Sequence, residues 1–163
     1  MHVNEVQKIH VQIGQVKTGQ AGQSLHAILG SCIGLGLLNP AAGLYGLAHC
    51  LLSKSPGTTD AISGRHVDQA LLSLQSLMDL SGKELRKIQA IVVGGANMTM
   101  PADTEPDRLV GSINARSAYR ALREAGVRNI YEDVGGMQGR QVTINCTTGE
   151  FTVASIPRLG VKS

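Results

Sequence analysis

Apolar and polar residues alternate in the first segment of the chain that we expect to form a strand. In KIHVQIGQV, residues 8–16, the apolar side chains of Ile9, Val11 and Ile13 are separated by polar neighbours. A period of two is typical of a strand that is buried on one face only. The pattern therefore predicts a half-buried strand near the start of the chain.

Two runs further along the chain are apolar almost throughout and contain glycines. The first, IGLGLLN at 33–39, follows the strand-like segment LHAIL at 25–29, and the second, GLYGLAHCLL, spans 43–52. They are joined by NPAAG, in which Asn-Pro followed shortly by Gly is typical of a turn. We therefore expect an antiparallel hairpin of two buried, central strands.

Two later segments repeat apolar residues at the spacing of a helix. Their apolar positions are Val67, Leu71, Leu74 and Met78 in the first segment, and Ala115, Ala118, Leu122 and Ala125 in the second. We expect the first helix to end at Ser81-Gly82. The second is expected to begin at Asn114 and to end before Gly126, because glycine is favoured directly after a helix.

Four more segments predict strands and complete the fold class. They are KIQAIVVGGANM (87–98), NIYEDV (129–134), QVTINC (141–146) and EFTVASI (150–156). The order is then four strands, a helix, a strand, a helix and three strands. Few helices among many strands predict an α+β fold, a layered α/β/β sandwich of mixed, mostly antiparallel strands with two main helices on one side. No repeat or linker divides residues 1–163, so we expect a single domain.

Composition and charge narrow the possible partners. Hydrophobic residues make up 42% of the chain and charged residues 17%, which suits a globular domain. The aromatic share is 2%, so the chain lacks the stacking surfaces with which proteins bind single-stranded nucleic acid. The net charge of +3 is spread along the sequence rather than gathered in one basic run. We therefore expect neither nucleic acid nor an anionic membrane surface as a partner.

The cysteines and the N-terminal segment indicate the compartment. Cys32, Cys50 and Cys146 are odd in number and irregular in spacing, so neither a disulfide framework nor a metal site is predicted. The first residues lack the apolar core of a signal peptide, and no apolar stretch is long enough to cross a bilayer. We expect a cytoplasmic protein with reduced thiols and no membrane insertion.

One cysteine lies where a nucleophile could be built. Cys32 closes a Gly30-Ser31-Cys32 turn, in which glycine permits close approach and N–H groups could hold an oxyanion. A hairpin that turns at 39–43 would place Cys32 opposite His49, and opposed residues have Cβ atoms about 4.5–5.5 Å apart. An imidazole at that distance can activate a thiol. The spacing therefore predicts a Cys–His dyad.

Each of these residues, taken singly, has another interpretation. A free cysteine is most often a small buried hydrophobic residue, and a lone histidine on an apolar strand is most often part of the core. We expect Cys50 and Cys146 to be structural, with Cys50 on the strand face opposite to that of its neighbour His49. Composition alone leaves both interpretations of Cys32 and His49 open.

Five sequence blocks together resemble the chemoreceptor glutamine deamidase family, CheD. The blocks are LGSC (29–32), GLAHCLL (46–52), VVGGANM (92–98), GSIN (111–114) and EDVGGMQGRQVTINCTTGEFTV (132–153). They occur in the family's order and at the family's spacing, and the resemblance covers about residues 8–156. It implies the family's α/β/β sandwich and, as activity, hydrolysis of receptor glutamine side chains to glutamate. It leaves open the cleavage of the receptors' glutamyl methyl esters.

The resemblance also assigns roles to residues. It makes Cys32 the nucleophile and His49 the general base of a cysteine-dependent amidohydrolase, with no metal or organic cofactor. The family's third residue is usually a threonine a few positions before the cysteine, where this chain has His26 and Ala27. We expect His26, or a backbone carbonyl, to orient the imidazole instead. The residues expected to contact the substrate are Gly30, Ser31, Gly94, Gly95 and Asn97.

Partners and alternatives follow from the same resemblance. The implied partner is the cytoplasmic domain of chemoreceptors. One alternative is a non-catalytic regulatory module that binds a CheC-type phosphatase or the receptor tail. Another is a cysteine amidohydrolase that acts on a different protein's glutamine, as some bacterial toxins do, although the sequence shows no secretion signal.

Overall fold

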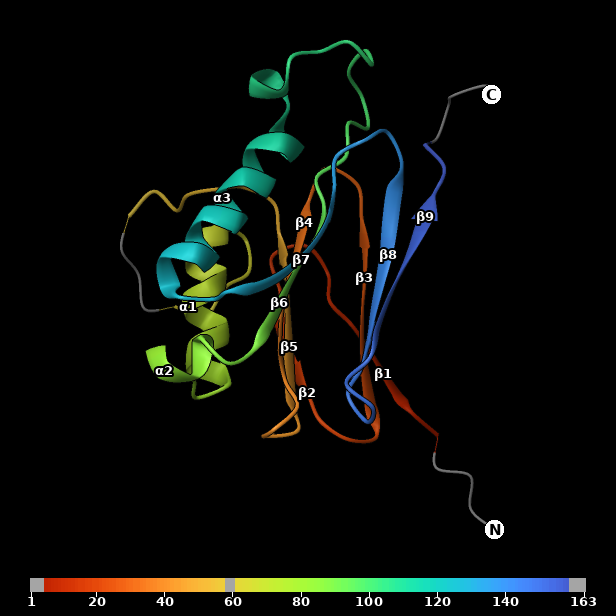
Figure 1. Cartoon of the computed structure of the whole chain (residues 1–163). Helices are drawn as coiled ribbons and strands as arrows, with labels where there is room; N and C mark the ends of the chain where they lie inside the picture. Colours follow the sequence, from red (N-terminus) through yellow and green to blue (C-terminus); the bar gives the residue numbers. More distant parts are fainter. Residues whose placement is uncertain (1–4, 58–60, 159–163) are drawn as a thin grey trace.

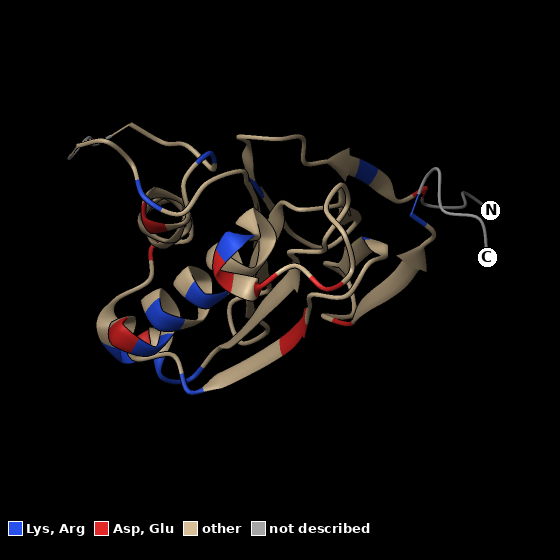
Figure 2. Cartoon of the chain, turned by 90° about the horizontal axis from the view of Figure 1, so that it is seen from above, with Lys and Arg blue, Asp and Glu red and all other residues tan. Residues whose placement is uncertain are grey.

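The computed structural model describes residues 5–57 and 61–158, and within them the chain forms two stacked β-sheets with helices on one side (Figure 1). The expected α+β fold, with three layers in the order helices, sheet, sheet, is therefore confirmed. None of the described helices is long and apolar enough to span a membrane. In Figure 2, Lys and Arg are interspersed with Asp and Glu over α3 (Val110–Ala125), the loops and the strands.

The outer sheet has four strands in the order β1-β3-β8-β9. They are β1 (Gln7–His10), β3 (Gln23–Leu29), β8 (Gly139–Asn145) and β9 (Phe151–Ile156). The β1–β3 pair is parallel, and the other two pairs are antiparallel. This sheet faces the second sheet with one side and solvent with the other (Figure 1).

The inner sheet has five strands in the order β2-β5-β4-β6-β7. They are β2 (Val16–Gly19), β5 (Leu44–Cys50), β4 (Ile33–Asn39), β6 (Gln89–Gly94) and β7 (Asn129–Val134). Only the β6–β7 pair is parallel. The predicted hairpin is confirmed as β4 and β5, which lie in the middle of this sheet and are buried along most of their length.

The helices cover the inner sheet on the side away from the outer sheet (Figure 1). They are α1 (Val67–Leu77), α2 (Gly82–Leu85) and α3, with a short 3-10 turn at Pro106–Arg108 before α3. Two cores result. The helix-side core lies between α1, α3 and the inner sheet, and contains among others Ile33, Leu35, Leu37, Cys50, Val92 and Leu122. The inter-sheet core lies between the two sheets and contains among others Leu25, Leu29, Cys32, Leu47, Val93, Ile144 and Cys146.

The expected first strand, residues 8–16, is interrupted. The chain leaves the outer sheet after His10, turns at residues 11–15 and enters the inner sheet as β2. Gly14, with a φ of +85°, permits that turn, and its N–H donates to the carbonyl of His49 at 2.9 Å. The alternation predicted one strand because a period of two does not reveal where a strand changes its partner sheet.

Both predicted helices form, with different ends. α1 ends at Leu77, and Ser81 instead caps the short helix α2 by accepting from the N–H of Glu84. α3 begins at Val110 rather than Asn114, and it ends before Gly126 as expected, with a φ of +101° at that glycine. The ends differ because apolar spacing identifies the buried face of a helix but does not locate its first or last residue.

Candidate active site

The turn that carries Cys32 connects the two sheets at one end of the sandwich. Residues 30–32 follow β3 of the outer sheet and precede β4 of the inner sheet, at the top of Figure 1. The carbonyl of Gly30 accepts from the N–H of Ala96 at 3.0 Å, and that of Cys32 accepts from Gly95 at 2.9 Å. Within the described residues, the N–H groups of Ser31 and Cys32 have no acceptor. The turn therefore has the carbonyls of Gly30 and Cys32 fixed and two N–H donors free.

The segment that fixes these carbonyls requires glycine. Gly94 and Gly95 have φ values of +111° and +65°, in the region that L-residues rarely adopt. A Cβ atom at Gly94 would collide with the carbonyl oxygen of Cys32, and one at Gly95 would lie 2.7 Å from the carbonyl oxygen of Gly111 in α3. The two glycines therefore allow the end of β6 to pack tightly between the Cys32 turn and α3.

The predicted pairing of Cys32 with His49 is wrong by two residues. His49 is paired with Gly34, and Cys50 with Ile33, so the position of Cys32 lies beyond the last strand pair. The reason is the hairpin loop, in which four residues, 40–43, separate the paired Asn39 and Leu44. The expected turn was centred one residue earlier, and each residue of shift at the centre displaces the register by two.

Cys32 and His49 nevertheless lie on the same side of the inner sheet. Cys32 belongs to the inter-sheet core, and His49 alternates with Leu47, which belongs to the same core, whereas Cys50 lies in the helix-side core. The expected opposite orientation of Cys50 is thus confirmed. Cys32 and His49 are diagonal neighbours, for which regular strands give Cα separations of about 7–8 Å. No hydrogen bond joins the thiol to the imidazole among the described residues.

A backbone carbonyl orients the His49 ring. The Nδ1 atom of His49 lies 2.9 Å from the carbonyl oxygen of Val11, and a carbonyl can only accept, so Nδ1 carries the proton. Nε2 is left with a lone pair and no hydrogen-bond partner among the described residues. Among the residues that the structure describes, every fully buried side-chain nitrogen or oxygen has a hydrogen-bond partner. Since Nε2 has none, it is not fully buried and is reached by solvent. The ring is therefore held in the tautomer that a general base requires.

Burial keeps both groups of the candidate dyad neutral. Burial raises the pKa of the Cys32 thiol above its ordinary value. Burial also lowers the pKa of His49, and the hydrogen bond to the Val11 carbonyl opposes that shift. Cys32 is 7% exposed and His49 is 5% exposed. Both shifts favour a thiol beside a neutral imidazole, rather than a thiolate beside an imidazolium, in the resting protein.

The side chain of His26 contacts neither Cys32 nor His49. Its Nε2 atom lies 2.7 Å from the Ser24 hydroxyl, and its Nδ1 atom lies 3.2 Å from the Thr143 hydroxyl. The strand alternation places His26 on the outer face of its sheet, since Leu25 and Ala27 face the inter-sheet core. Its backbone is closer to the site, because the carbonyl of His26 accepts from the Val11 N–H at 2.7 Å. His26 thus holds Val11, and Val11 holds His49.

Asn97 lies next to the turn and is buried, whereas Gly30 belongs to the turn and is partly buried. The amide of Asn97 donates to the Pro101 carbonyl at 3.0 Å and accepts from the Met100 N–H at 2.8 Å, so it fixes its own loop. A Cβ atom on Gly30 would lie 3.0 Å from Cγ of Met98. The side chain of Met98 therefore lies over Gly30.

A pocket of about 500 Å³ opens to solvent beside His49. Its lining comes from the β1–β2 loop, from β3 and from His49, and consists of His10, Val11, Gln12, Ile13, His26, Ala27, Ile28 and His49. Cys32 is not part of this lining. The pocket therefore gives access to the imidazole from the side of the β1–β2 loop.

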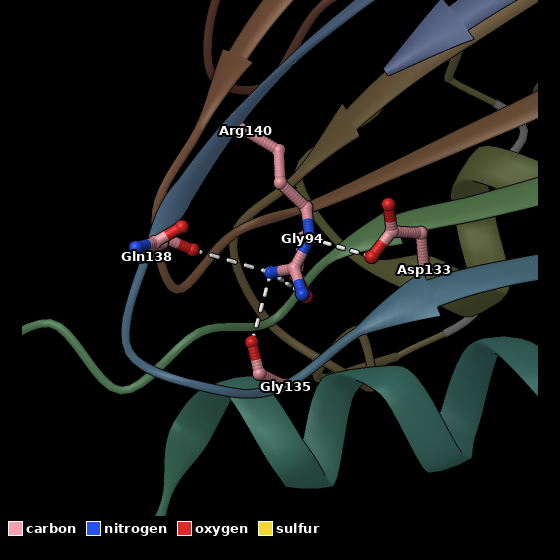
Figure 3. Close-up of polar contacts among 5 residues, drawn as sticks. All are labelled: Gly94, Asp133, Gly135, Gln138 and Arg140. Atoms are coloured by element: carbon pink, nitrogen blue, oxygen red, sulfur yellow. Dashed lines mark hydrogen bonds and ion pairs between the residues drawn. The ribbon is translucent and has the colours of Figure 1, made fainter. Parts of the chain in front are cut away.

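Two elements of the site have no signal in the sequence. One is the Val11 carbonyl, because every residue has a carbonyl and only the fold decides where it points. The other is Arg140, whose guanidinium contacts Asp133 and the carbonyls of Gly94, Gly135 and Gln138 (Figure 3). The register of β3 and β8, which places Arg140 opposite Leu29, is what brings it to this end of the sandwich.

Comparison with known proteins identifies the family. The family model described as CheD chemotactic sensory transduction matches residues 51–155. The probable chemoreceptor glutamine deamidase CheD 2 of Ruegeria sp. (strain TM1040) is 48% identical over 172 residues, which cover 96% of this chain and 96% of that protein. The chain belongs to the CheD family. Cys32 and His49 lie before the residues that the family model matches. The similarity to the Ruegeria protein covers 96% of the chain.

More distant CheD proteins are similar over most of the chain as well. The probable chemoreceptor glutamine deamidase CheD of Bdellovibrio bacteriovorus is 28% identical over 91% of this chain and 95% of that protein. The chemoreceptor glutamine deamidase CheD of Thermotoga maritima is 29% identical over 78% of each chain. Among solved structures, YlmD from Geobacillus stearothermophilus is similar at a TM-score of 0.46, with 16% identity over 82% of this chain and 61% of that one. That last similarity is too low to bear on function.

Proposed function

We propose that this CheD-family chain is a cysteine-dependent amidohydrolase that converts glutamine side chains of chemoreceptors to glutamate. The substrate class comes from its relatives, which carry the name chemoreceptor glutamine deamidase. The observation that carries the chemistry is His49, whose Nδ1–H is held by the Val11 carbonyl while Nε2 is free, on the same side of the sheet as Cys32. The proposed setting is the cytoplasmic part of the receptors.

The first half of the reaction forms a thioester. Sγ of Cys32 attacks Cδ of the substrate glutamine as its proton passes to Nε2 of His49, because burial disfavours a separate thiolate and imidazolium. The free N–H groups of Ser31 and Cys32 donate to the oxyanion that develops on the amide oxygen. His49 then returns its proton to the leaving nitrogen, and ammonia departs.

The second half restores the thiol. We place the hydrolytic water in the pocket that reaches His49 from the β1–β2 loop. Nε2 of His49 accepts a proton from that water as the oxygen attacks the thioester carbon. The C–S bond breaks, the sulfur regains its proton from His49, and the product is glutamate. A glutamyl methyl ester would react in the same way, with methanol as the leaving group.

The series of hydrogen bonds from His26 through Val11 to His49 supports the role of His49 as general base without a threonine side chain. The links that orient the imidazole are the backbone carbonyls of His26 and Val11, and neither depends on the identity of the side chain. A hydroxyl at position 26 or 27 is therefore not required to hold His49. Gly94 and Gly95 act through their backbone, by holding the Cys32 turn, and Asn97 acts by holding the loop that follows them.

The test is the mass of a receptor cytoplasmic fragment after incubation with the protein. Each conversion of an amide to an acid changes the mass by the exchange of NH₂ for OH, and peptide mapping then locates the modified glutamine. We expect wild-type protein to convert specific glutamines and Cys32→Ala to convert none, with Cys146→Ala as the matched cysteine control. Wild-type activity in Cys32→Ala would refute the proposal. Binding of the fragment without any conversion by wild-type protein would instead favour a non-catalytic role.

A further inference from the structure

Arg140 reaches from one sheet to the other at the end of the sandwich that holds Cys32. It lies on β8 of the outer sheet, directly opposite Leu29, the last residue of β3. Its side chain is only 11% exposed and extends toward the ends of β6 and β7 in the inner sheet (Figure 3). The Cys32 turn crosses the same gap as a covalent connection, so Arg140 forms a second bridge beside it.

The guanidinium gathers backbone carbonyls from two segments. Nη1 donates to the carbonyl of Gly135 at 2.9 Å and, at 3.3 Å each, to those of Gly94 and Gln138. Nε donates to the Asp133 carboxylate at 3.0 Å, which orients the planar group (Figure 3). Hydrogen bonds from a charged donor are stronger than those between neutral groups, and they are stronger still where water is largely excluded.

These contacts continue to the Cys32 turn in one step. The N–H of Gly135 donates to the carbonyl of Gly94 at 3.0 Å, so the carbonyl that Arg140 holds is held from a second side. The next N–H along the chain, that of Gly95, donates to the carbonyl of Cys32 at 2.9 Å. Ala96 then donates to Gly30. Arg140 therefore holds the carbonyl of Gly94, and the N–H groups of the next two residues, Gly95 and Ala96, hold the Cys32 turn.

We propose that Arg140 is a positioning residue for Cys32, which acts by locking the Gly94–Gly95 segment against the turn. This inference rests on the proposed role of Cys32 as the nucleophile. Nε and Nη1 of Arg140 are engaged within the protein, so it acts through the backbone of Gly94. We call these contacts of Arg140 with Asp133 and the backbone carbonyls the Arg140 clamp. While the clamp is in place, the free N–H groups of Ser31 and Cys32 keep one orientation relative to the sulfur. Without it, the end of β6 can move relative to the outer sheet, and the donors no longer meet the oxyanion.

The experiment compares Arg140→Gln, Arg140→Lys and Asp133→Asn with the wild-type protein. Arg116→Gln is the matched control, because Arg116 on α3 makes an exposed ion pair of 2.9 Å with Asp107 of the preceding 3-10 turn and, among the described residues, makes no hydrogen bond with the Cys32 turn. Three quantities are measured: kcat and KM for deamidation of a receptor fragment, the rate at which iodoacetamide alkylates Cys32 as a function of pH, and the thermal unfolding midpoint. Cys32→Ala is run on the same fragment.

For Arg140→Gln we expect kcat to fall roughly tenfold to a hundredfold with little change in KM, because small displacements of reacting groups cost about that much. The pH profile of Cys32 alkylation should differ from that of the wild type, because the turn that fixes the surroundings of the thiol is released. Arg140→Lys, which keeps the charge but not the planar fork, and Asp133→Asn should show intermediate losses. Arg116→Gln should match the wild type.

The inference is overturned by an Arg140→Gln protein with wild-type kcat and an unchanged alkylation profile. If the unfolding midpoint of that protein is lower, Arg140 is structural only. If Arg140→Gln does not fold, the same result for Arg140→Lys and Asp133→Asn has the same meaning. Failure of the proposed function is distinguishable, because Cys32→Ala would then retain activity. If Cys32→Ala is inactive and the Arg140 variants are fully active, the proposed function stands and only the role proposed for Arg140 is refuted.

Discussion

The inter-sheet core ends in a cysteine at both of its ends, and only one of the two is equipped for chemistry. Cys32 lies near the start of β8, and Cys146 follows the end of the same strand, so the two thiols close opposite ends of one apolar layer. Beside Cys32 are an oriented imidazole and two free N–H donors. At the other end, the backbone N–H of Cys146 donates to the Gln23 carbonyl, and its Sγ lies 2.8 Å from where a Cβ atom of Gly19 would be.

The comparison shows that burial alone does not distinguish a catalytic cysteine from a structural one. Both thiols are buried, and burial raises the pKa of each, that of Cys146 to about 11. The difference lies in the neighbouring backbone. At the Cys32 end, Gly94 and Gly95 fix the carbonyls and leave the donors free, whereas at the Cys146 end the backbone donor is used. Function at one end of this layer is therefore built by the surrounding hydrogen bonds.

The largest expected effect tests the imidazole. His49→Gln removes the base but keeps a polar side chain of similar length, so we expect kcat to fall by roughly 10²–10⁴-fold, the usual contribution of general acid–base catalysis. The measurement is ammonia release from a receptor fragment, with circular dichroism to show that the fold is retained. For Cys146→Ala, at the other end of the core, kcat should stay within about twofold of the wild-type value, since no step of the proposed mechanism uses Cys146. Equal losses in the two variants would abolish the contrast between the ends.

A second prediction compares one glycine from each end. Gly94 and Gly22 both have positive φ values, +111° and +89°, but a Cβ atom at Gly22 would meet nothing within 4 Å, whereas one at Gly94 would collide with the Cys32 carbonyl. Gly22→Ala should cost about 1–2 kcal/mol of unfolding free energy from backbone strain. Gly94→Ala should cost about 3 kcal/mol or more, because overpacking adds to the strain.

Urea denaturation measures both glycine variants, and deamidation is assayed on the fraction that remains folded. We expect Gly22→Ala to keep its activity per folded molecule and Gly94→Ala to lose most of it. Equal destabilisation by the two substitutions would show that the close approach of Gly94 to the turn has no energetic consequence.

Much of the architecture could be predicted because it follows from the pattern of apolar residues. The β4–β5 hairpin corresponds to two continuous apolar runs around a turn, and both main helices correspond to a period of 3.6. The three layers follow from the number of strands and helices that these patterns predict. The break within residues 8–16 could not be predicted, because the turn at Gly14 is fixed by a hydrogen bond to His49, which is distant in sequence. A partner of that kind leaves no local pattern.

Residue type and spacing single out the side chains of Cys32 and His49 but none of the backbone groups around them. Cys32 and His49 were candidates from residue type and spacing, although the register between them was misjudged by two residues. The Val11 carbonyl and the free N–H groups of the turn could not be identified, because backbone groups are the same at every position. Arg140 reaches the site only through the β3–β8 register, which depends on the pairing of segments more than a hundred residues apart.

The reactivity of the thiols gives a third, smaller contrast. Cys32 is 7% exposed and Cys50 is fully buried, and burial raises the pKa of Cys50 far above that of an ordinary thiol. We expect iodoacetamide to modify Cys32 at least about tenfold faster than Cys146 or Cys50 in the folded protein, because alkylation requires an accessible thiolate. Peptide mapping after partial alkylation measures the three rates. A faster reaction at Cys146 would place the reactive end of the layer where we do not expect it.

The smallest expected effect concerns acid, and it compares two histidines with Cys146. Burial lowers the pKa of His49 and of His26, and the positive charges of His10 and Lys8 lower that of His26 further. Such groups bind protons more weakly in the folded state than in the unfolded state. Above pH 6.5, the ordinary pKa of a histidine in the unfolded chain, both groups are neutral in both states and do not affect folding stability. As the pH falls below 6.5, the unfolded state binds protons first, so folding stability is lost. Cys146, whose pKa is raised, does not titrate in this range.

Urea midpoints at about pH 7.5 and about pH 5.5 measure this loss of stability. The wild-type protein should unfold at lower urea at the acidic pH. His26→Gln should lose less stability between the two values, because the amide can still bond to the Ser24 and Thr143 hydroxyls but does not titrate. Cys146→Ala should show the full wild-type loss, whatever its stability at neutral pH. A smaller acid loss in Cys146→Ala than in His26→Gln would contradict the assignment of the acid-sensitive groups to the histidines.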